Sequence, residues 1–572
     1  MFTINEILYQ HYPQITHKPW LFKPAKLVLS YLLHEQDFND FSTTYPHLNG
    51  LDFVEQILEH FNVSYSVHDT EKERIPCSGR CVIIANHPIG TLDGLALLKL
   101  ISEVRQDIKI IANQMLMAVK PLHSMMLPVD NMGTGTVKEN LSNIQKHLAS
   151  EGVVIIFPAG EVSRLRPQGV RDTEWQSGFL RIAKKAQAPI LPLLIEAKNS
   201  PTFYGASMLY KPLATLLIIR EMFKKERRHF PIRIGELIPA SSYIGAKISI
   251  KQQVKLFKKH LYRLNSNKRP IFETQKGIAL PEDRRNLQAA MQSDCQRLGT
   301  TSDNKEIYLY RYNGSSPILR EIGRLREIAF RAVGEGSNKR RDIDAYDNNY
   351  FHLVLWDNKD LEIVGAYRFG DAKKLVSKSN NKDLYSASLF KYDEAMKSYF
   401  EQGLELGRSF IQPKYWGKRN LDYLWYGIGA FLKHHPEYRY LFGPVSLSHS
   451  YPETAKNLIV YFYQHYFGGD LHLAQSNSPY QLPVNLEHPF KGDDYKADFA
   501  ELKYLLSSMG VAVPTLYKQY CEICEPGGAK FLSFGVDPDF NNCVDGLILV
   551  DLAYLKDSKR RRYMDDVSEL PT

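Results

Sequence analysis

The sequence predicts two α/β domains joined in one chain. At 572 residues the chain exceeds what one hydrophobic core usually holds, since cores stop growing at about 250–300 residues. Short apolar strands alternate with helical stretches in both halves, a pattern typical of layered α/β folds. Hydrophobic residues make up 44% and charged residues 24% of the chain, so we expect an ordinary folded protein throughout.

The N-terminal half begins with helical patterns and continues as strands alternating with helices. Residues 51–61 (LDFVEQILEHF) form an amphipathic stretch. From residue 81, an apolar strand (CVIIAN) leads into a turn (HPIGTLDG) and then a helix (LALLKLI). Further strands are expected at 108–113, 152–158 and 188–196. This alternation predicts a sheet covered by helices.

Two polar stretches mark the change from one domain to the next. They are NSNKRPIFETQKG (265–277) and TTSDNKE (300–306), and we place the boundary between them. The first domain is therefore expected at 1–290, with its motifs at 81–200, and the second at 300–572. A new strand at 307–312 (IYLYRY) opens the second domain.

The formal net charge of +9 suits an anionic partner, which leaves nucleic acid, an anionic membrane and an acidic protein to consider. Zinc-finger spacing, an RNP-like strand and a long basic arm are all missing. We therefore expect no nucleic-acid binding, and the membrane and the acidic protein remain.

The six cysteines and the apolar segments bear on the compartment. The one CxxC pair, Cys521 and Cys524, has no second pair and no nearby histidine, so reduced thiols without a metal site are expected. The N-terminus shows no secretory signal, and no stretch reaches the roughly 18 apolar residues of a spanning helix. These features predict a cytoplasmic protein that lies on a membrane rather than in it.

The turn after the strand at 81–86 carries the first candidate site. In NHPIGTLDG (86–94), His87 and Asp93 flank Gly90. A histidine oriented by a carboxylate is a general base for a hydroxyl. Downstream, FPAGEVSR (157–164) follows another apolar strand, and we expect its polar groups to bind a phosphate or polar head group: Gly160, Glu161 and Arg164. The alternative for His87 and Asp93 is a purely structural hydrogen bond.

Over roughly residues 50–260 these blocks resemble the glycerolipid acyltransferases that make phosphatidic acid. The order is the His–Asp block, a middle loop, the FPAG block and a strand with a proline-containing block (APILPLL, from 188). The resemblance implies that His87 takes the proton of an acceptor hydroxyl, which attacks an acyl thioester, while Asp93 orients the imidazole. Five residues rather than four separate the two, so the Gly90 turn must bring them together. Ala159 stands where the family usually has glutamate.

An apolar stretch at 204–223 is followed by the basic cluster KKERR (224–228). Such a pair is typical of a segment that lies on an anionic lipid surface. A buried helix with a solvated basic loop is the alternative.

The second candidate site lies in LELGRSFI (404–411), which reads as a strand. In a flat strand Glu405 and Arg408 point to opposite faces, and Gly407 permits a bulge that re-aims one of them. We take Glu405 as the base for an attacking α-amine. Asp344 and Asp347 then hold a cationic amino acid. Three arginines bind its carboxylate or organise the acidic side chains of the site: Arg326, Arg368 and Arg408. A structural ion-pair network is the competing interpretation.

The second half resembles GNAT acyltransferases of the branch that uses acyl–acyl carrier protein, most of all the ornithine N-acyltransferases and more distantly the acyl-homoserine-lactone synthases. The distant match is carried by the charged residues above, and DPDFNNCVDGLILVDL (537–552) resembles the closing segment of the ornithine branch. The GNAT loop RxxGxG that binds the CoA pyrophosphate is not evident. The GEGS stretch (334–337) replaces the tryptophan of the lactone synthases.

Together the halves resemble the bifunctional ornithine lipid synthases: an N-terminal glycerolipid-acyltransferase-like αβ domain and a C-terminal GNAT-like mixed-sheet domain. The resemblance implies that the second domain N-acylates ornithine from 3-hydroxyacyl–acyl carrier protein. The first domain then O-acylates the 3-hydroxyl. Beyond the thioester donor no cofactor is expected, and the partners are acyl carrier protein, the inner face of a bacterial cytoplasmic membrane and ornithine.

Two other classes of function remain open on the sequence. One is a glycerophospholipid acyltransferase whose GNAT domain acts on another amino acid, such as glycine or lysine. The other is a membrane-binding scaffold or lytic protein without catalysis, against which the intact His87, Asp93, Glu405 and Arg408 argue.

Overall fold

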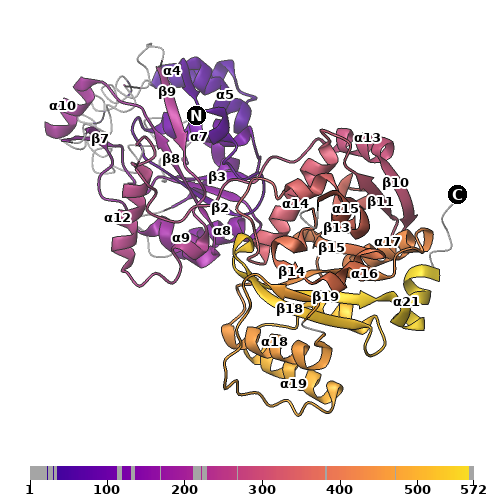
Figure 1. Ribbon diagram of the computed structural model, residues 1–572. Helices are drawn as coiled ribbons and strands as arrows, with labels where there is room; N and C mark the ends of the chain where they lie inside the picture. Colours follow the sequence, from indigo (N-terminus) through magenta and orange to yellow (C-terminus); the bar gives the residue numbers. More distant parts are fainter. Residues whose placement is uncertain are drawn as a thin grey trace. The chain divides into compact units, whose positions relative to one another are not determined.

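The computed structural model describes residues 22, 30, 35–112, 117, 119–129, 136–167, 169–209, 221, 228–266, 268–379, 383–469 and 472–565. The chain divides into two compact units, Met1–Gly277 and Ile278–Thr572 (Figure 1). The division falls at the end of the first polar stretch, upstream of the expected 290–300. Residues 278–290 go with the second unit because helix α13 (Arg284–Asp294) buries Leu287 and Met291 in that unit's core.

A seven-stranded sheet forms the centre of the first unit, in the order β1-β9-β8-β2-β5-β3-β4. Every neighbouring pair is parallel except β8 and β9. The strands are β1 (Val63–Ser66), β2 (Cys81–Ala85), β3 (Ile108–Ala112), β4 (Met126–Pro128), β5 (Val153–Ile156), β8 (Ile190–Ile195) and β9 (Arg228–Ile234).

Helices cover both faces of this sheet, as its uninterrupted apolar strands require. Alternate residues of β2 enter different cores: Ile83 packs with α5 (Gly50–His60) and α7 (Thr91–Ser102), and Ile84 packs on the other face. The second face carries α8 (Thr136–Ala149), α9 (Gly178–Ala186) and α12 (Ile250–Leu261). The remaining elements are α4 (Glu35–Thr44), α6 (Asp69–Lys72), η2 (Lys120–Met125), β6 (Arg164–Arg166), β7 (Gly169–Arg171), α10 (Pro201–Leu209) and η3 (Ala240–Ser242).

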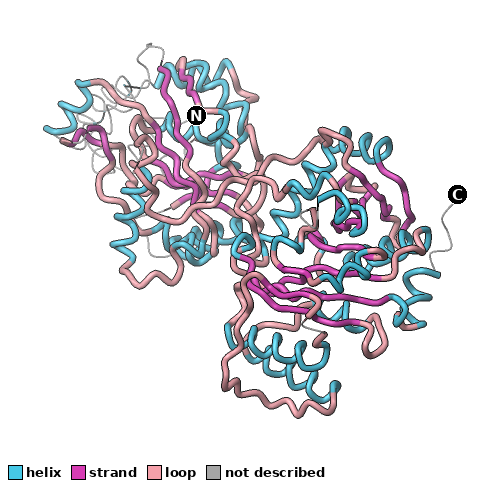
Figure 2. Tube along the Cα trace, in the orientation of Figure 1, coloured by secondary structure: helices cyan, strands magenta, loops and turns pink. Residues whose placement is uncertain are grey.

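The second unit is built on an eight-stranded mixed sheet in the order β10-β11-β12-β13-β15-β16-β19-β18 (Figure 2). All neighbours are antiparallel except β15 and β16. The strands are β10 (Cys295–Thr300), β11 (Lys305–Arg311), β12 (Phe351–Asp357), β13 (Glu362–Asp371), β15 (Gly403–Ile411), β16 (Tyr440–Leu447), β18 (Ala529–Asp537) and β19 (Cys543–Asp551).

Helix α14 (Pro317–Ala332) packs on one face of this sheet and α17 (Asn420–His434) on the other, because neighbouring residues of β12 alternate: Val354 faces α14 and Leu355 faces α17. The other elements are α15 (Ala372–Ser379), α16 (Lys397–Phe400), α18 (Glu453–Phe467), α19 (Tyr495–Ser508), α20 (Thr515–Glu522), α21 (Asp557–Arg560), the pair β14 (Phe390–Tyr392) and β17 (Ala474–Ser476), and the short helical turns η4 (Ala345–Asn348), η5 (Ser386–Ser388), η6 (Glu394–Met396), η7 (Pro413–Tyr415), η8 (Pro538–Phe540), η9 (Leu552–Tyr554) and η10 (Arg561–Asp565).

Strands β15 and β16 pair over a short length and then diverge. The pairing joins Gly403–Glu405 to Tyr440–Phe442. Beyond it, β15 carries a bulge, since Arg408 and Ser409 lie opposite the single residue Tyr367 of β13. The bulge expected at Gly407 is therefore present, but the residue with positive φ (53°) is Arg408.

Among the described residues, no helix has the length and apolar character needed to cross a membrane. Most of the predicted lipid-surface segment, 210–220 and 222–227, lies outside the described residues.

Candidate active sites

His87 lies in the turn between β2 and α7. The buried side chain of the preceding residue, Asn86, makes a pair of hydrogen bonds to the backbone of Ile195 at the end of β8. Its Nδ2 donates to the carbonyl oxygen (2.9 Å) and its Oδ1 accepts from the N–H (2.7 Å). This double contact fixes where the turn leaves the sheet, and so fixes the position of His87.

Asp93 lies beneath His87 in the first turn of α7. Its Oδ2 is 3.1 Å from His87 Nδ1 and accepts the backbone N–H groups of Ile89 (2.9 Å) and Gly90 (3.1 Å). Gly90 has φ 90° and ψ −141°, a conformation open essentially to glycine. The turn thus brings His87 and Asp93 together across their five-residue separation.

The surroundings of Asp93 orient the imidazole. Burial raises the pKa of the Asp93 carboxyl, and the His87 ring and the two turn N–H groups oppose that rise. The Asp93 side chain is 0% exposed and the His87 side chain 19% exposed, with its ring stacked on Phe157 at 4.2 Å between centroids. A carboxylate at Nδ1 favours the tautomer with its proton there, which leaves the Nε2 lone pair to accept a proton.

The FPAG loop is joined to the His87 turn. The Ser163 N–H donates to the His87 carbonyl oxygen at 2.7 Å, which places the predicted head-group loop beside the histidine. Gly160 turns the loop with φ 66°. Arg164 Nη2 lies 3.4 Å from Glu161 Oε2, while its other terminal nitrogen, Nη1, is buried with no hydrogen-bond partner among the described residues.

Asp172 is a positioning residue that sequence reasoning missed. It is 2% exposed and its carboxylate accepts three donors: the His87 N–H (3.1 Å), Ser163 Oγ (2.5 Å) and Trp175 Nε1 (2.8 Å). It therefore ties the histidine turn to the FPAG loop. The local sequence, an acid three residues before Trp175, gives no signal that connects Asp172 to a histidine so far away in the chain.

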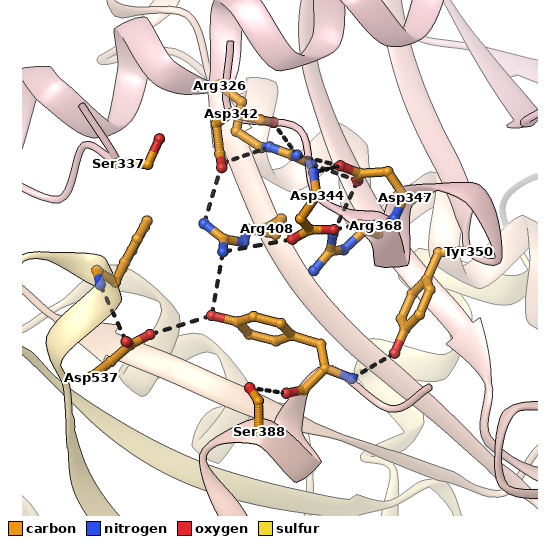
Figure 3. A network of polar contacts seen from close by, with 12 residues as sticks. Arg326, Ser337, Asp342, Asp344, Asp347, Tyr350, Arg368, Ser388, Arg408 and Asp537 are labelled. Atoms are coloured by element: carbon orange, nitrogen blue, oxygen red, sulfur yellow. Dashed lines mark hydrogen bonds and ion pairs between the residues drawn. The ribbon is translucent and has the colours of Figure 1, made fainter. Parts of the chain in front are cut away.

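In the second unit, arginines and aspartates form one buried network (Figure 3). Arg326 binds Asp347 with both terminal nitrogens (3.1 and 2.9 Å), and its Nε lies 2.8 Å from Asp342. Arg368 Nη1 donates to Asp344 (2.7 Å) and Asp347 (3.0 Å). Both arginines hold the pKa of the Asp347 carboxyl well below its usual range, against its burial.

Arg408 completes the network from the bulge of β15. Its Nη1 lies 3.2 Å from Asp342 and its Nη2 lies 3.8 Å from Asp344. Three arginines thus neutralise three aspartates, and Asp342 is a member that the sequence did not suggest. Arg326, Arg368 and Asp347 are at most 1% exposed, as in a structural network, whereas Arg408 (12%) and Asp344 (17%) are more accessible.

Glu405 lies outside this network and holds a turn. Its Oε1 accepts the Ser386 N–H at 2.6 Å, and its Oε2 accepts the Tyr385 N–H at 3.1 Å and the Tyr350 hydroxyl. Burial raises the pKa of the Glu405 carboxyl, and these donors oppose the rise. Both oxygens are therefore engaged in holding the Tyr385–Ser388 turn.

Two family profiles match the chain in order. The profile described as "Acyltransferase" matches residues 12–269, and the profile described as "Acetyltransferase (GNAT) domain" matches residues 325–426. Each match falls within one of the two compact units.

Curated relatives carry both kinds of activity in their names. A glycine N(alpha)-acyltransferase of Phocaeicola vulgatus is 31% identical over 303 residues, covering 50% of this chain and 92% of that protein. A lyso-glycine lipid O-acyltransferase of the same organism is 27% identical over 232 residues, covering 39% of this chain and 82% of that protein. An L-ornithine N(alpha)-acyltransferase of Agrobacterium fabrum is 32% identical over 117 residues, covering 19% of this chain and 39% of that protein.

The two profiles, the two units and these relatives agree. The chain belongs to the family of bifunctional aminolipid acyltransferases, in which an N-terminal acyltransferase domain and a C-terminal GNAT domain carry out O-acyl and N-acyl transfer.

Proposed function

We propose that the second unit forms an amide between an amino acid and a 3-hydroxyacyl chain, and that the first unit then esterifies the 3-hydroxyl with a second acyl chain. The order follows from the chemistry, because the amide product supplies the hydroxyl that the ester step consumes. The observation that carries the proposal is the contact of His87 with buried Asp93, an arrangement suited to deprotonating a hydroxyl.

In the ester step, His87 Nε2 accepts the hydroxyl proton while Asp93 stabilises the imidazolium that forms. The hydroxyl oxygen attacks the thioester carbonyl carbon, the C–S bond breaks, and the imidazolium returns its proton to the leaving thiolate. We assign the neighbouring loop to the polar head group of the acceptor: Gly160, Glu161 and Arg164. The buried Nη1 of Arg164, without a partner among the described residues, supports this assignment.

In the amide step, Arg408 and Asp344 are the members of the charged network that we assign to substrate contact, because they are its more exposed groups. Arg326, Asp347 and Arg368 hold them in place. Glu405, the base predicted from the sequence, is assigned to positioning, since its two oxygens already accept hydrogen bonds from the turn at Tyr385 and from Tyr350.

Glycine is the head group that the relatives support best, since two glycine N-acyltransferases are covered over 92% and 90% of their length. Asp344 and Asp347, expected to hold a cationic side chain, are bound by arginines, which also favours an amino acid without a second ammonium. Ornithine is the second candidate, supported by the 32% identity to an ornithine N-acyltransferase.

For the donor and the location, we propose acyl–acyl carrier protein and the cytoplasmic face of the membrane. The missing CoA loop supports the carrier protein, and the net charge of +9 suits both an acidic carrier and an anionic surface. The acyl thioester is the only cofactor-like group that the proposed chemistry requires.

Lipid mass spectrometry of a host that lacks aminolipids tests the whole proposal. The wild-type chain is expected to yield a diacylated amino-acid lipid whose mass identifies the head group. His87→Ala is expected to accumulate the monoacyl amide, since losing a general base costs about 100- to 10,000-fold in rate. Glu405→Ala is expected to yield neither lipid. His68→Ala, at an exposed histidine of the same unit, is the matched control.

Normal amounts of diacyl lipid from His87→Ala would contradict the role of the first unit. Loss of every aminolipid from a folded His87→Ala protein would contradict the division of labour between the units.

A further inference from the structure

The GEGS stretch at 334–337 is fixed beside the C-terminal end of strand β16. Ser448 Oγ donates to the Val333 carbonyl oxygen at 2.6 Å, and Asn541 Nδ2 donates to the Gly334 carbonyl oxygen at 2.6 Å. On its other side, Ser337 donates to Glu327 through its N–H (3.1 Å) and its Oγ (2.7 Å). Glu335 is therefore held at a defined position by residues from three other segments.

Asp545 lies on β19, the strand next to the edge strand β18, and is close enough to Glu335 for the two carboxyls to interact electrostatically. Sheet register places Asp545 opposite Ser446 of β16 and Gly535 of β18. The Asp545 side chain is buried, with the residue 3% exposed, and its Oδ1 has no hydrogen-bond partner among the described residues. An unpartnered carboxylate oxygen at such a depth indicates a missing donor.

The charges around this pair leave an excess of negative charge. Arg408 is the cation next to both carboxylates, but its guanidinium is already shared with Asp342 and Asp344 (Figure 3). Asp537 adds another carboxylate, whose Oδ2 lies 3.4 Å from the Tyr385 hydroxyl, itself 3.4 Å from Arg408 Nη2. Because Arg326, Arg368 and Arg408 balance Asp342, Asp344 and Asp347, the further acids make this corner of the site attractive to a cationic group such as an ammonium: Asp537, Asp545 and Glu335.

We propose that Asp545 and Glu335 bind the α-ammonium of the amino-acid substrate, and that Asp545 accepts its proton. This inference rests on the proposed amide-forming function of the second unit. The ammonium gives one proton to Asp545, the amine nitrogen attacks the thioester carbonyl carbon, and a C–N bond forms. The C–S bond then breaks, and the second proton of the nitrogen goes to the leaving thiolate. Glu335, which is partly exposed, holds the ammonium on the solvent side.

The raised pKa values of this pair support the same assignment. Burial raises the pKa of Asp545 to about 7 and that of Glu335 to about 7. Such carboxyls match the pH at which a general base works best. The charged and titratable groups that face them are Arg408 of β15, Asp537 of β18, Cys543 of β19, Tyr517 of α20, Tyr385 and Tyr451.

The test compares Asp545→Asn, Glu335→Gln and the exposed control Glu394→Gln in the full chain. Thiol release from a 3-hydroxyacyl thioester of acyl carrier protein is followed against pH, with glycine, ornithine or aminooxyacetate as acceptor. The aminooxy group is already deprotonated at neutral pH and needs no base. For Asp545→Asn we expect kcat with the amino acid to fall about 100- to 10,000-fold, and less than about tenfold with aminooxyacetate. For Glu335→Gln we expect a higher KM for the amino acid.

Equal losses with both acceptors would overturn the proton-accepting role, because a structural defect does not distinguish them. Wild-type kcat/KM in a folded Asp545→Asn protein would also overturn it. If Asp545→Asn does not fold, an unchanged KM in Glu335→Gln still overturns the ammonium site. A wild-type chain that releases no thiol with any amino acid contradicts the proposed function itself, and so separates the two failures.

Discussion

Asp93 and Asp172 hold different parts of His87. Asp93 lies 3.1 Å from the imidazole Nδ1, whereas Asp172 accepts the backbone N–H of the same residue at 3.1 Å. Asp93 therefore governs the protonation and orientation of the ring, and Asp172 governs where the main chain carries it. Substitutions at the two positions should have different effects.

Asp172→Asn is expected to lower both stability and the rate of the ester step. An amide in place of the carboxylate cannot accept all three donors, so buried polar groups lose their partner at a cost of about 1–3 kcal/mol. Asp93→Asn is expected to slow the ester step by less than His87→Ala does. Urea unfolding and ester-forming turnover of purified variants measure both quantities. An Asp172→Asn protein with unchanged stability and turnover would contradict its positioning role.

The buried Asp545 should also leave a signature in stability against pH. Its pKa is raised to about 7 in the fold from 3.8, so the folded chain keeps a proton that the unfolded chain loses near pH 4. Stability from this group is present at low pH and is lost as pH rises from about 4 through about 7, by on the order of 2–4 kcal/mol. Asp545→Asn removes this pH-dependent loss. The free energy of unfolding of the wild type should therefore fall relative to that of the variant between pH 5 and pH 8. Melting temperatures are measured for both proteins across that range. A difference between them that stays the same at every pH would contradict the raised pKa.

At the scale of elements, the β2–α7 turn performs three tasks in a few residues. Asn86 joins the turn to β8, Gly90 reverses the chain, and Asp93 accepts the N–H groups of the turn. The N-terminus of α7 also favours a carboxylate there through the helix dipole. Sequence spacing alone indicated that a turn was needed, because five residues separate His87 from Asp93.

Gly90→Ala is expected to impair the ester step and leave the amide step unchanged. A side chain at φ 90° and ψ −141° costs on the order of 1–3 kcal/mol, and the turn can relieve that strain by moving His87. Gly178→Ala is the control, since that glycine has an ordinary φ and open space around its Cβ position. The rates of the ester-forming and the amide-forming steps are both measured on the full chain. Equal ester turnover in both variants would show that the turn geometry is not required.

At the scale of the whole molecule, the donor is expected to be a carrier protein rather than CoA. The chain has no evident CoA pyrophosphate loop and carries a net charge of +9 opposite an acidic carrier. Thiol release is measured with matched acyl chains on acyl carrier protein and on CoA, at low and at high salt. The carrier thioester should react faster, and salt should reduce its advantage. Equal or faster turnover with acyl-CoA would contradict this expectation.

The full chain is also expected to bind anionic vesicles and to leave them in part at high salt, because a net positive charge is attracted to anionic lipid and screened by ions. Sedimentation with anionic and with neutral vesicles measures this binding. Equal binding to both kinds of vesicle, without an effect of salt, would contradict the electrostatic account.

The two α/β domains, their order and the His87–Asp93 turn could be predicted from the sequence, since these depend on local patterns: apolar strands, a glycine in a turn and residues a few positions apart. Which charged residues meet depends instead on the tertiary fold. Asp172, Asp342, Glu335 and Asp545 reach their sites through strand register and loop contacts between distant segments, which no local spacing encodes. The same limit applies to Glu405. Its strand was predicted from the sequence, but its burial under the Tyr385–Ser388 turn depends on packing between distant segments.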